Sequence, residues 1–131
     1  FPSMQPLWRA QIGGVHAYFG LMECAATYDY LKSKGKRPFI LTRSSAIGSN
    51  RFTFHWTGDN VAHFDFLRYS ITHNFMFQIW GIQMVGADIC GFTGETTVEL
   101  CSRWFQLGAL YPFSRNHNFL TSKAQEAYAL G

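Results

Sequence analysis

The chain has 131 residues and a formal net charge of +3 at pH 7; 47% of its residues are hydrophobic and 18% are aromatic. This length suits one ordinary domain with a substantial core, and the apolar content excludes an intrinsically disordered chain. The small charge gives no indication of nucleic-acid binding, and no apolar run reaches the length of a membrane-spanning helix.

Hydrophobic spacing predicts helices that alternate with short apolar strands, after an irregular segment over 1–19. Lysines and Gly35 mark the end of the first helix, and Thr96 or Thr97 is the expected N-cap of the third. This order of elements predicts βα units and a parallel sheet, so the expected fold class is α/β. The expected elements are a helix over 21–34, strands over 39–42 and 52–56, a helix over 65–80, a strand over 84–87, a helix over 96–107 and a strand over 109–113.

Charged or titratable residues follow each of the four expected strands. Arg43 follows the first, Asp59 the second, Asp88 the third, and the string Arg-Asn-His-Asn at 115–118 the fourth. In parallel α/β sheets and barrels, functional residues collect at the carboxyl ends of the strands. We therefore expect these four positions to meet at one rim, which is the candidate site.

Two of these residues have a structural explanation beside the functional one. Gly-Asp-Asn at 58–60 is ordinary turn chemistry, which the local string favours for Asp59. Its place at a strand end beside Trp56 favours a functional role. Asp88 needs a partner, so it forms a salt bridge, for which Arg43 is one candidate, or it accepts hydrogen bonds from ligand hydroxyls. Arg43 has the matching choice between a carboxylate and a ligand.

Among the remaining candidates, a lone histidine such as His117 is more often structural than functional, although Arg115 and Asn116 beside it favour a polar rim. Trp56 and Phe92 lie next to the polar strand ends, where aromatic walls of a pocket are expected. Trp104 lies within the third helix and is expected in the core.

The three cysteines leave two alternatives open. Cys90 and Cys101 bracket a glycine-containing loop and could close a small ring by a disulfide, or all three cysteines could be unpaired residues of the core. Cys24 lies in a helical stretch and is expected to be a buried free thiol. No Cys-x-x-Cys pair is present and the histidines show no ligand spacing, so no metal or cofactor is expected.

The chain carries five strings in a specific order and spacing: RPFILTRSSAIGSNR, HWTGDN, DFLRYSI, GIQMVGADICGF and ELCSRWFQLGALYPFSRNHN. Together they closely resemble the α-glucosidases of glycoside hydrolase family 31, from about His16 to Asn118. GADICGF and RNHN look like the branch of lysosomal acid α-glucosidase and sucrase–isomaltase. They look less like the glucosidase II branch of the endoplasmic reticulum.

The resemblance implies that residues 1–131 are one fragment of a (β/α)8 TIM-barrel catalytic domain, covering its later βα units. It implies retaining hydrolysis of terminal α-linked glucose from oligosaccharides, with Asp59 as general acid/base. It also implies a disulfide between Cys90 and Cys101 and a place in the secretory pathway, lysosomal or extracellular. The glucose subsite that it implies is lined by Arg43, Trp56, Asp88, Phe92 and His117.

Retaining hydrolysis needs a second carboxylate, the nucleophile, about 5 Å from the acid/base. In this family it lies in a Trp-x-Asp-Met-Asn-Glu string upstream of the acid/base, and the 131 residues contain no such string. Asp29 precedes Asp59 but lies in a helical stretch. We therefore expect the chain, whose Phe-Pro-Ser start we take as a processing or truncation point, to need the rest of its barrel. The alternative is an inactive fragment that acts as a structural or binding element.

Overall fold

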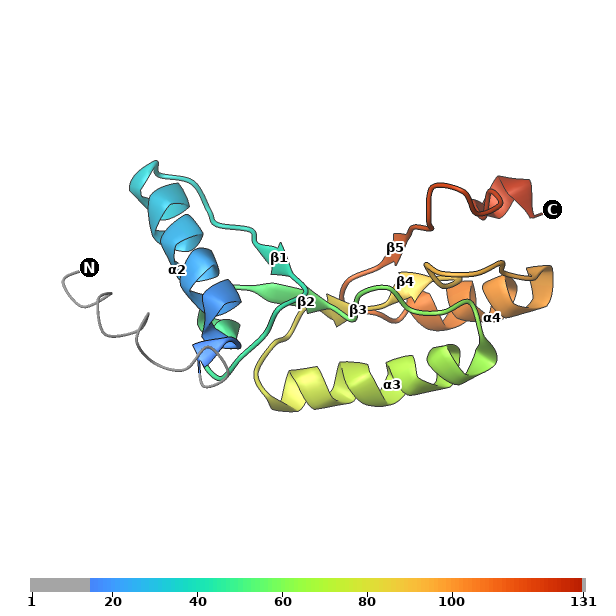
Figure 1. Cartoon of the computed structure of the whole chain (residues 1–131), viewed down its shortest axis with the longest axis horizontal. Helices are drawn as coiled ribbons and strands as arrows, with labels where there is room; N and C mark the ends of the chain where they lie inside the picture. Colours follow the sequence, from blue (N-terminus) through green and yellow to red (C-terminus); the bar gives the residue numbers. More distant parts are fainter. Residues whose placement is uncertain (1–14, 131) are drawn as a thin grey trace. The chain divides into compact units, whose positions relative to one another are not determined.

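The computed structural model describes residues 15–130, which fall into two compact units that divide after Thr53 (Figure 1). The first unit contains the helix α2 (Tyr18–Ser33), the short strand β1 (Leu41–Thr42) and the 3-10 turn η1 (Ser49–Arg51). The second unit contains the remaining elements: β2 (Phe54–Trp56), α3 (Phe64–Ile79), β3 (Val85–Gly86), β4 (Asp88–Ile89), α4 (Val98–Gly108), β5 (Arg115–Asn116) and η2 (Ala127–Ala129).

Helix α2 follows its predicted pattern. Lys34 is its C-cap and Gly35 follows with a φ of 69°, a left-handed conformation that suits glycine at a helix end. Cys24 is its buried residue and is a free thiol, as predicted, and burial raises the pKa of that thiol. Most of the segment predicted to be irregular, 1–19, lies outside the described residues. Helix α2 begins at Tyr18, so the last two residues of that segment are helical.

The second unit is built from two parallel strand pairs. β2 pairs with β3, with His55 opposite Val85 and Trp56 opposite Gly86. β4 pairs with β5, with Asp88 opposite Arg115 and Ile89 opposite Asn116. Helix α3 connects β2 to β3 and helix α4 connects β4 to β5, so both crossovers are βαβ units. The predicted α/β class with parallel strands is confirmed.

The fourth strand lies later than the sequence predicted. Residues 109–113 form a turn after α4, in which Leu110 N donates to Leu107 O and Tyr111 N to Gly108 O. Pro112 has no N–H to give to a ladder, and the strand forms two residues beyond Phe113. Arg115 and Asn116 are therefore inside β5 rather than after it. The third predicted strand, over 84–87, is reduced to β3, and Asp88, expected to follow it, instead opens the separate strand β4, which has a different partner.

Helix α3 was located by its apolar spacing, but that row of side chains is not its buried face. Phe75 is 63% exposed and Ile79 is 82% exposed. The buried residues of the helix are Ser70 and Asn74. Asn74 Nδ2 donates to Ser70 O at 2.7 Å, whereas Asn74 Oδ1 has no hydrogen-bond partner within residues 15–130. A buried polar group is tolerated where a hydrogen bond replaces its water.

The core of the second unit lies between the β4–β5 pair, α3 and α4. Trp104 is fully buried, as predicted, and its Nε1 donates to Tyr111 Oη at 3.1 Å, while the same hydroxyl lies 2.5 Å from Ser70 Oγ. The buried core thus packs against the strands that carry the candidate site. Its members are Ala87, Ile89, Cys90, Leu100, Cys101, Trp104 and Tyr111.

No helix within residues 15–130 combines the length and the apolar character that a bilayer crossing requires.

Candidate active site

Asp59 stands at the tip of the turn that follows β2. Thr57 N donates to Gly86 O at 3.0 Å, which continues the ladder with β3 for one more residue. Gly58 then turns the chain with a φ of 80°. Buried Asn60 closes the turn, since its Oδ1 accepts from Thr57 Oγ1 at 2.9 Å. The polar groups of Thr57 and Asn60 are thus hydrogen-bonded within the turn or to β3, and the Asp59 side chain is exposed.

A second loop, after β4, is bonded to this turn. Asn60 O accepts hydrogen bonds from Phe92 N at 2.7 Å and from Thr93 N at 3.0 Å. Gly91, with a φ of 88°, lies so close to Ala62 that a Cβ at position 91 would overlap the Ala62 backbone. The loops that carry Asp59 and Phe92 therefore lie side by side because a bare glycine permits their close approach.

Asp88 opens β4 and is paired with a cation from β5. Its side chain is 1% exposed, and its Oδ1 accepts from Arg115 Nη2 at 2.7 Å and from Nε at 3.2 Å. The Arg115 guanidinium also lies 5.1 Å from the ring centre of Trp56. Within the described residues, Asp88 Oδ2 has no hydrogen-bond partner.

The Asp88 carboxyl responds to several charges of the candidate site. Burial raises its pKa above the ordinary 3.8, and the hydrogen bonds and charge of Arg115 oppose that rise. His117 also lowers this pKa and Asp59 raises it through their charges. These charge effects, beside the contacts that Arg115 makes with Asp88 and Trp56, link Asp88 to other residues of the candidate site.

Phe92 and His117 form an aromatic pair at the same edge. Their ring centres are 5.0 Å apart and their planes differ by 28°, an offset stack. Phe119 meets Phe92 edge-on at 5.8 Å, and its N–H donates to Phe92 O at 3.0 Å. The half-buried Phe92 therefore supports the exposed His117 ring.

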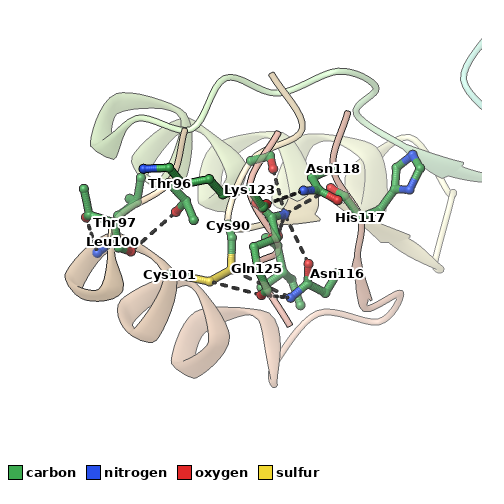
Figure 2. The surroundings of a disulfide bond; sticks show 12 residues. Cys90, Thr96, Thr97, Leu100, Cys101, Asn116, His117, Asn118, Lys123 and Gln125 are labelled. Atoms are coloured by element: carbon green, nitrogen blue, oxygen red, sulfur yellow. Dashed lines mark hydrogen bonds between the residues drawn. A yellow bond between two sulfur atoms is a disulfide. The ribbon is translucent and has the colours of Figure 1, made fainter. Parts of the chain in front are cut away.

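A disulfide lies close to the segment that carries His117 (Figure 2). It joins Cys90, directly after β4, to Cys101 in α4, and both residues are fully buried. The pairing implied by the family resemblance is therefore present, and the alternative of three unpaired cysteines is wrong. Cys90 has a φ of 77°, a conformation uncommon for a residue with a Cβ, immediately before Gly91 and Phe92.

The second unit brings together five of the six residues proposed from sequence for the active site: Trp56, Asp59, Asp88, Phe92 and His117. The sixth, Arg43, is an exposed residue of the first unit, directly after β1. Sequence reasoning missed that Arg115 is the partner of Asp88, because it placed Arg115 beyond the strand. In the described part of the chain, no group of three or more His, Cys, Asp or Glu side chains could hold a metal ion.

Comparison with known proteins then decides the family. The family model described as the glycosyl hydrolases family 31 TIM-barrel domain matches residues 5–131. The chain belongs to glycoside hydrolase family 31. Its parallel strands and connecting helices are part of the (β/α)8 barrel of that family and do not close a barrel within residues 15–130.

Among curated relatives in family 31, a probable α-glucosidase of Oryza sativa subsp. japonica is 51% identical over 94% of this chain. A lysosomal acid α-glucosidase of Tetrahymena pyriformis is 54% identical over 87% of it. A crystal structure of the glucosidase II α subunit superposes with a TM-score of 0.83 at 40% identity, over 89% of this chain and 13% of that one. The chain spans only 15% and 12% of the lengths of the two curated relatives.

Proposed function

We propose that this family 31 chain supplies the acid/base half of a retaining α-glucosidase site that removes terminal α-linked glucose from oligosaccharides. The observation that carries the proposal is the position of Asp59: an exposed carboxylate on a glycine turn at the carboxyl end of a parallel strand. Functional groups of barrel enzymes lie at that end of the strands. The α-glucosidase relatives support the substrate class.

Asp59 is proposed as the general acid/base. A retaining mechanism needs a carboxylic acid that protonates the leaving oxygen and then, as a carboxylate, takes a proton from water. Such a group must reach the scissile bond, and Asp59 is exposed at the tip of its turn, with the main chain held on both sides by Thr57 and Asn60. A turn held in this way restricts the main chain that carries the carboxyl, which lowers the entropic cost of positioning it for proton transfer.

The other five residues are proposed to bind the glucose. Trp56 and Phe92 offer ring faces, to which the apolar faces of a sugar pack. Asp88, Arg43 and His117 offer polar hydrogen-bonding groups for sugar hydroxyls. Oδ2 of Asp88, which lacks a partner within residues 15–130, is the acceptor proposed for one hydroxyl. Because Arg115 covers this buried carboxylate, binding there requires the Arg115 side chain to shift.

The nucleophile is proposed to come from a part of the barrel outside these 131 residues, because none of them forms the family's nucleophile string. Residues 1–131 are accordingly proposed to be one segment of the (β/α)8 catalytic domain, inactive without the rest of it. We place the whole protein in the secretory pathway, lysosomal or extracellular. The disulfide and the lysosomal relative support that location.

The test replaces Asp59 by Asn in the complete enzyme and compares two substrates. Maltose has a poor leaving group that needs protonation, so its hydrolysis should fall by at least about a thousandfold. Release of 4-nitrophenol from its α-glucoside, a good leaving group, should fall much less in the bond-breaking step. Asp65→Asn, the same change at an exposed carboxylate in the first turn of α3, is the control. Normal turnover of maltose by Asp59→Asn would refute the assignment.

A second candidate function is that of a non-catalytic structural or binding element. The missing nucleophile string favours it, as do large apolar side chains left exposed in the described residues, such as Ile79 and Leu110. The purified 131-residue chain mixed with 4-nitrophenyl α-glucoside tests the inactivity that both proposals assign to the isolated chain. Release of nitrophenol would refute that inactivity, and with it the role of a non-catalytic element.

A further inference from the structure

The side chain of Gln125 contacts two segments of the candidate active site, one around Gly91 and one around His117. It is buried, on the chain that returns after β5 (Figure 2). Its Nε2 atom lies 3.0 Å from Gly91 O, 3.2 Å from Ile89 O and 3.3 Å from His117 O. One amide therefore contacts main-chain carbonyls in the segment that leads to Phe92 and at His117, the two partners of the aromatic stack.

Asn116 completes this contact in a reciprocal way. Gln125 Nε2 lies 3.1 Å from Asn116 Oδ1, and Asn116 Nδ2 donates to the main-chain carbonyl of Gln125 at 2.7 Å. The disulfide lies alongside, since Cys101 Sγ is 3.9 Å from the same carbonyl. The side chain and the main chain of Gln125 are thus both fixed relative to β4 and β5.

Two further contacts hold the segment that carries Gln125. The Glu95 carboxylate accepts from Lys123 N, at 3.1 Å and 3.4 Å from its two oxygens. Asn118 Nδ2 donates to Lys123 O at 2.7 Å. Both contacts are exposed, so the buried amide of Gln125 is the water-excluded part of the attachment.

We propose that Gln125 is a positioning residue for substrate binding: it sets the spacing of the Phe92–His117 stack by bonding to the main chain at Gly91 and His117. This inference rests on the proposed function, in which that stack is one wall of the glucose subsite. The amide nitrogen is an uncharged donor with two hydrogens, which suits a buried position whose neighbours are four oxygen acceptors. An acceptor placed there would face those oxygens without a proton and be repelled.

The isosteric variant Gln125→Glu tests this, because it replaces the donor by an acceptor at unchanged size. In the complete enzyme, with 4-nitrophenyl α-glucoside, KM should rise at least about tenfold while kcat changes less than about threefold. Gln106→Glu makes the same change at an exposed position of α4, and should leave both constants within about twofold. Gln125→Met, which removes the donor without adding charge, should give a smaller rise in KM.

The outcomes separate this inference from the function on which it rests. A parent enzyme without glucosidase activity refutes the proposed function itself. An active parent together with a folded Gln125→Glu variant of unchanged KM, or with a loss confined to kcat, overturns only the role of Gln125. If the Glu variant does not fold, the Met variant decides. If neither folds, Gln125 is a requirement of the fold and the positioning role is overturned.

Discussion

Two nitrogens of Arg115 donate to a single oxygen of Asp88, Oδ1: Nη2 at 2.7 Å and Nε at 3.2 Å. Asp88 is 1% exposed and Arg115 is 32% exposed, so a buried anion is neutralised from the solvent side. The same guanidinium lies over Trp56, 5.1 Å from its ring centre. Arg115 therefore contacts both the buried carboxylate of Asp88 and the ring of Trp56, an aromatic side chain of the candidate subsite.

Removing that cation should be costly. Arg115→Met keeps much of the apolar stem but leaves the Asp88 carboxylate buried without its partner, which should lower the free energy of unfolding by about 3 kcal/mol. Urea denaturation measures the difference. Arg103→Met is the matched control: it breaks the exposed pair between Arg103 and Glu99, which is worth less than about 1 kcal/mol. Equal losses for the two variants would contradict the buried-pair account.

Asp88 should also make stability depend on pH. Its pKa in the folded protein is raised above 3.8 by burial, so just above pH 3.8 the folded state binds a proton that the unfolded state has released. Stability should therefore fall as the pH rises from 3.8 through the folded pKa. Asp88→Asn should remove this component, so the unfolding free energy of the parent should rise relative to that of the variant as the pH falls from the folded pKa toward 3.8. A parent that loses stability relative to the variant over this fall in pH would contradict the sign.

The hydroxyl of Tyr111 should be worth more than its exposed counterpart. Tyr111→Phe removes the acceptor of Trp104 Nε1 and the partner of Ser70 Oγ, both inside the core. Leaving buried polar groups unpaired should cost about 1–3 kcal/mol in unfolding free energy. Tyr128→Phe, at a residue that is 85% exposed, should cost almost nothing. The comparison fails if both variants unfold at the same urea concentration.

Two glycines separate backbone strain from crowding. Gly91 and Gly94 have φ values of 88° and 85°, but only Gly91 faces a neighbour, the backbone of Ala62. Gly94→Ala should cost about 1–2 kcal/mol for the left-handed conformation alone. Gly91→Ala should cost clearly more, because Ala62 and the Asp59 turn must also move. Thermal unfolding of the two variants gives the comparison, and equal melting temperatures would count against the close approach.

The disulfide gives a thiol count and a stability difference. Under denaturing, non-reducing conditions the chain should show one reactive thiol, that of Cys24; three would contradict the pairing. Replacing Cys90 and Cys101 together by Ala should lower the free energy of unfolding by about 2–4 kcal/mol. Cys24→Ala leaves the loop closed and should cost less.

Much of the second unit could be predicted because its signals are local. Thr97 caps α4, with its hydroxyl accepting from Leu100 N at 3.2 Å, and glycine follows the end of α2. The predicted strand over 84–87 was found as a short apolar run, because both residues of β3 within it are buried. The fourth strand was misplaced for the complementary reason: Arg115 and Asn116 look like a polar loop, and only their partners across the pair, Asp88 and Ile89, make them a strand.

The candidate site was predictable to a similar extent. The positions of Asp59, Asp88 and His117 near strand ends could be read from the order of the elements. Gln125 could not, because nothing in the residues around it marks a buried amide among four oxygen atoms. Such an environment arises only when β4, β5 and the returning chain meet.

The pairing of β4 with β5 is only two residues long, and so short a ladder has little hydrogen bonding with which to choose its alignment. Asp88 stands directly opposite Arg115, and a shift by one residue would set the buried carboxylate opposite Ser114 or Asn116 and turn the cation to the other face. The ion pair therefore disfavours every wrong alignment of the two strands, because each would separate a buried carboxylate from its cation. Together with the contacts of Gln125, it fixes the offset at which the segments carrying Phe92 and His117 meet.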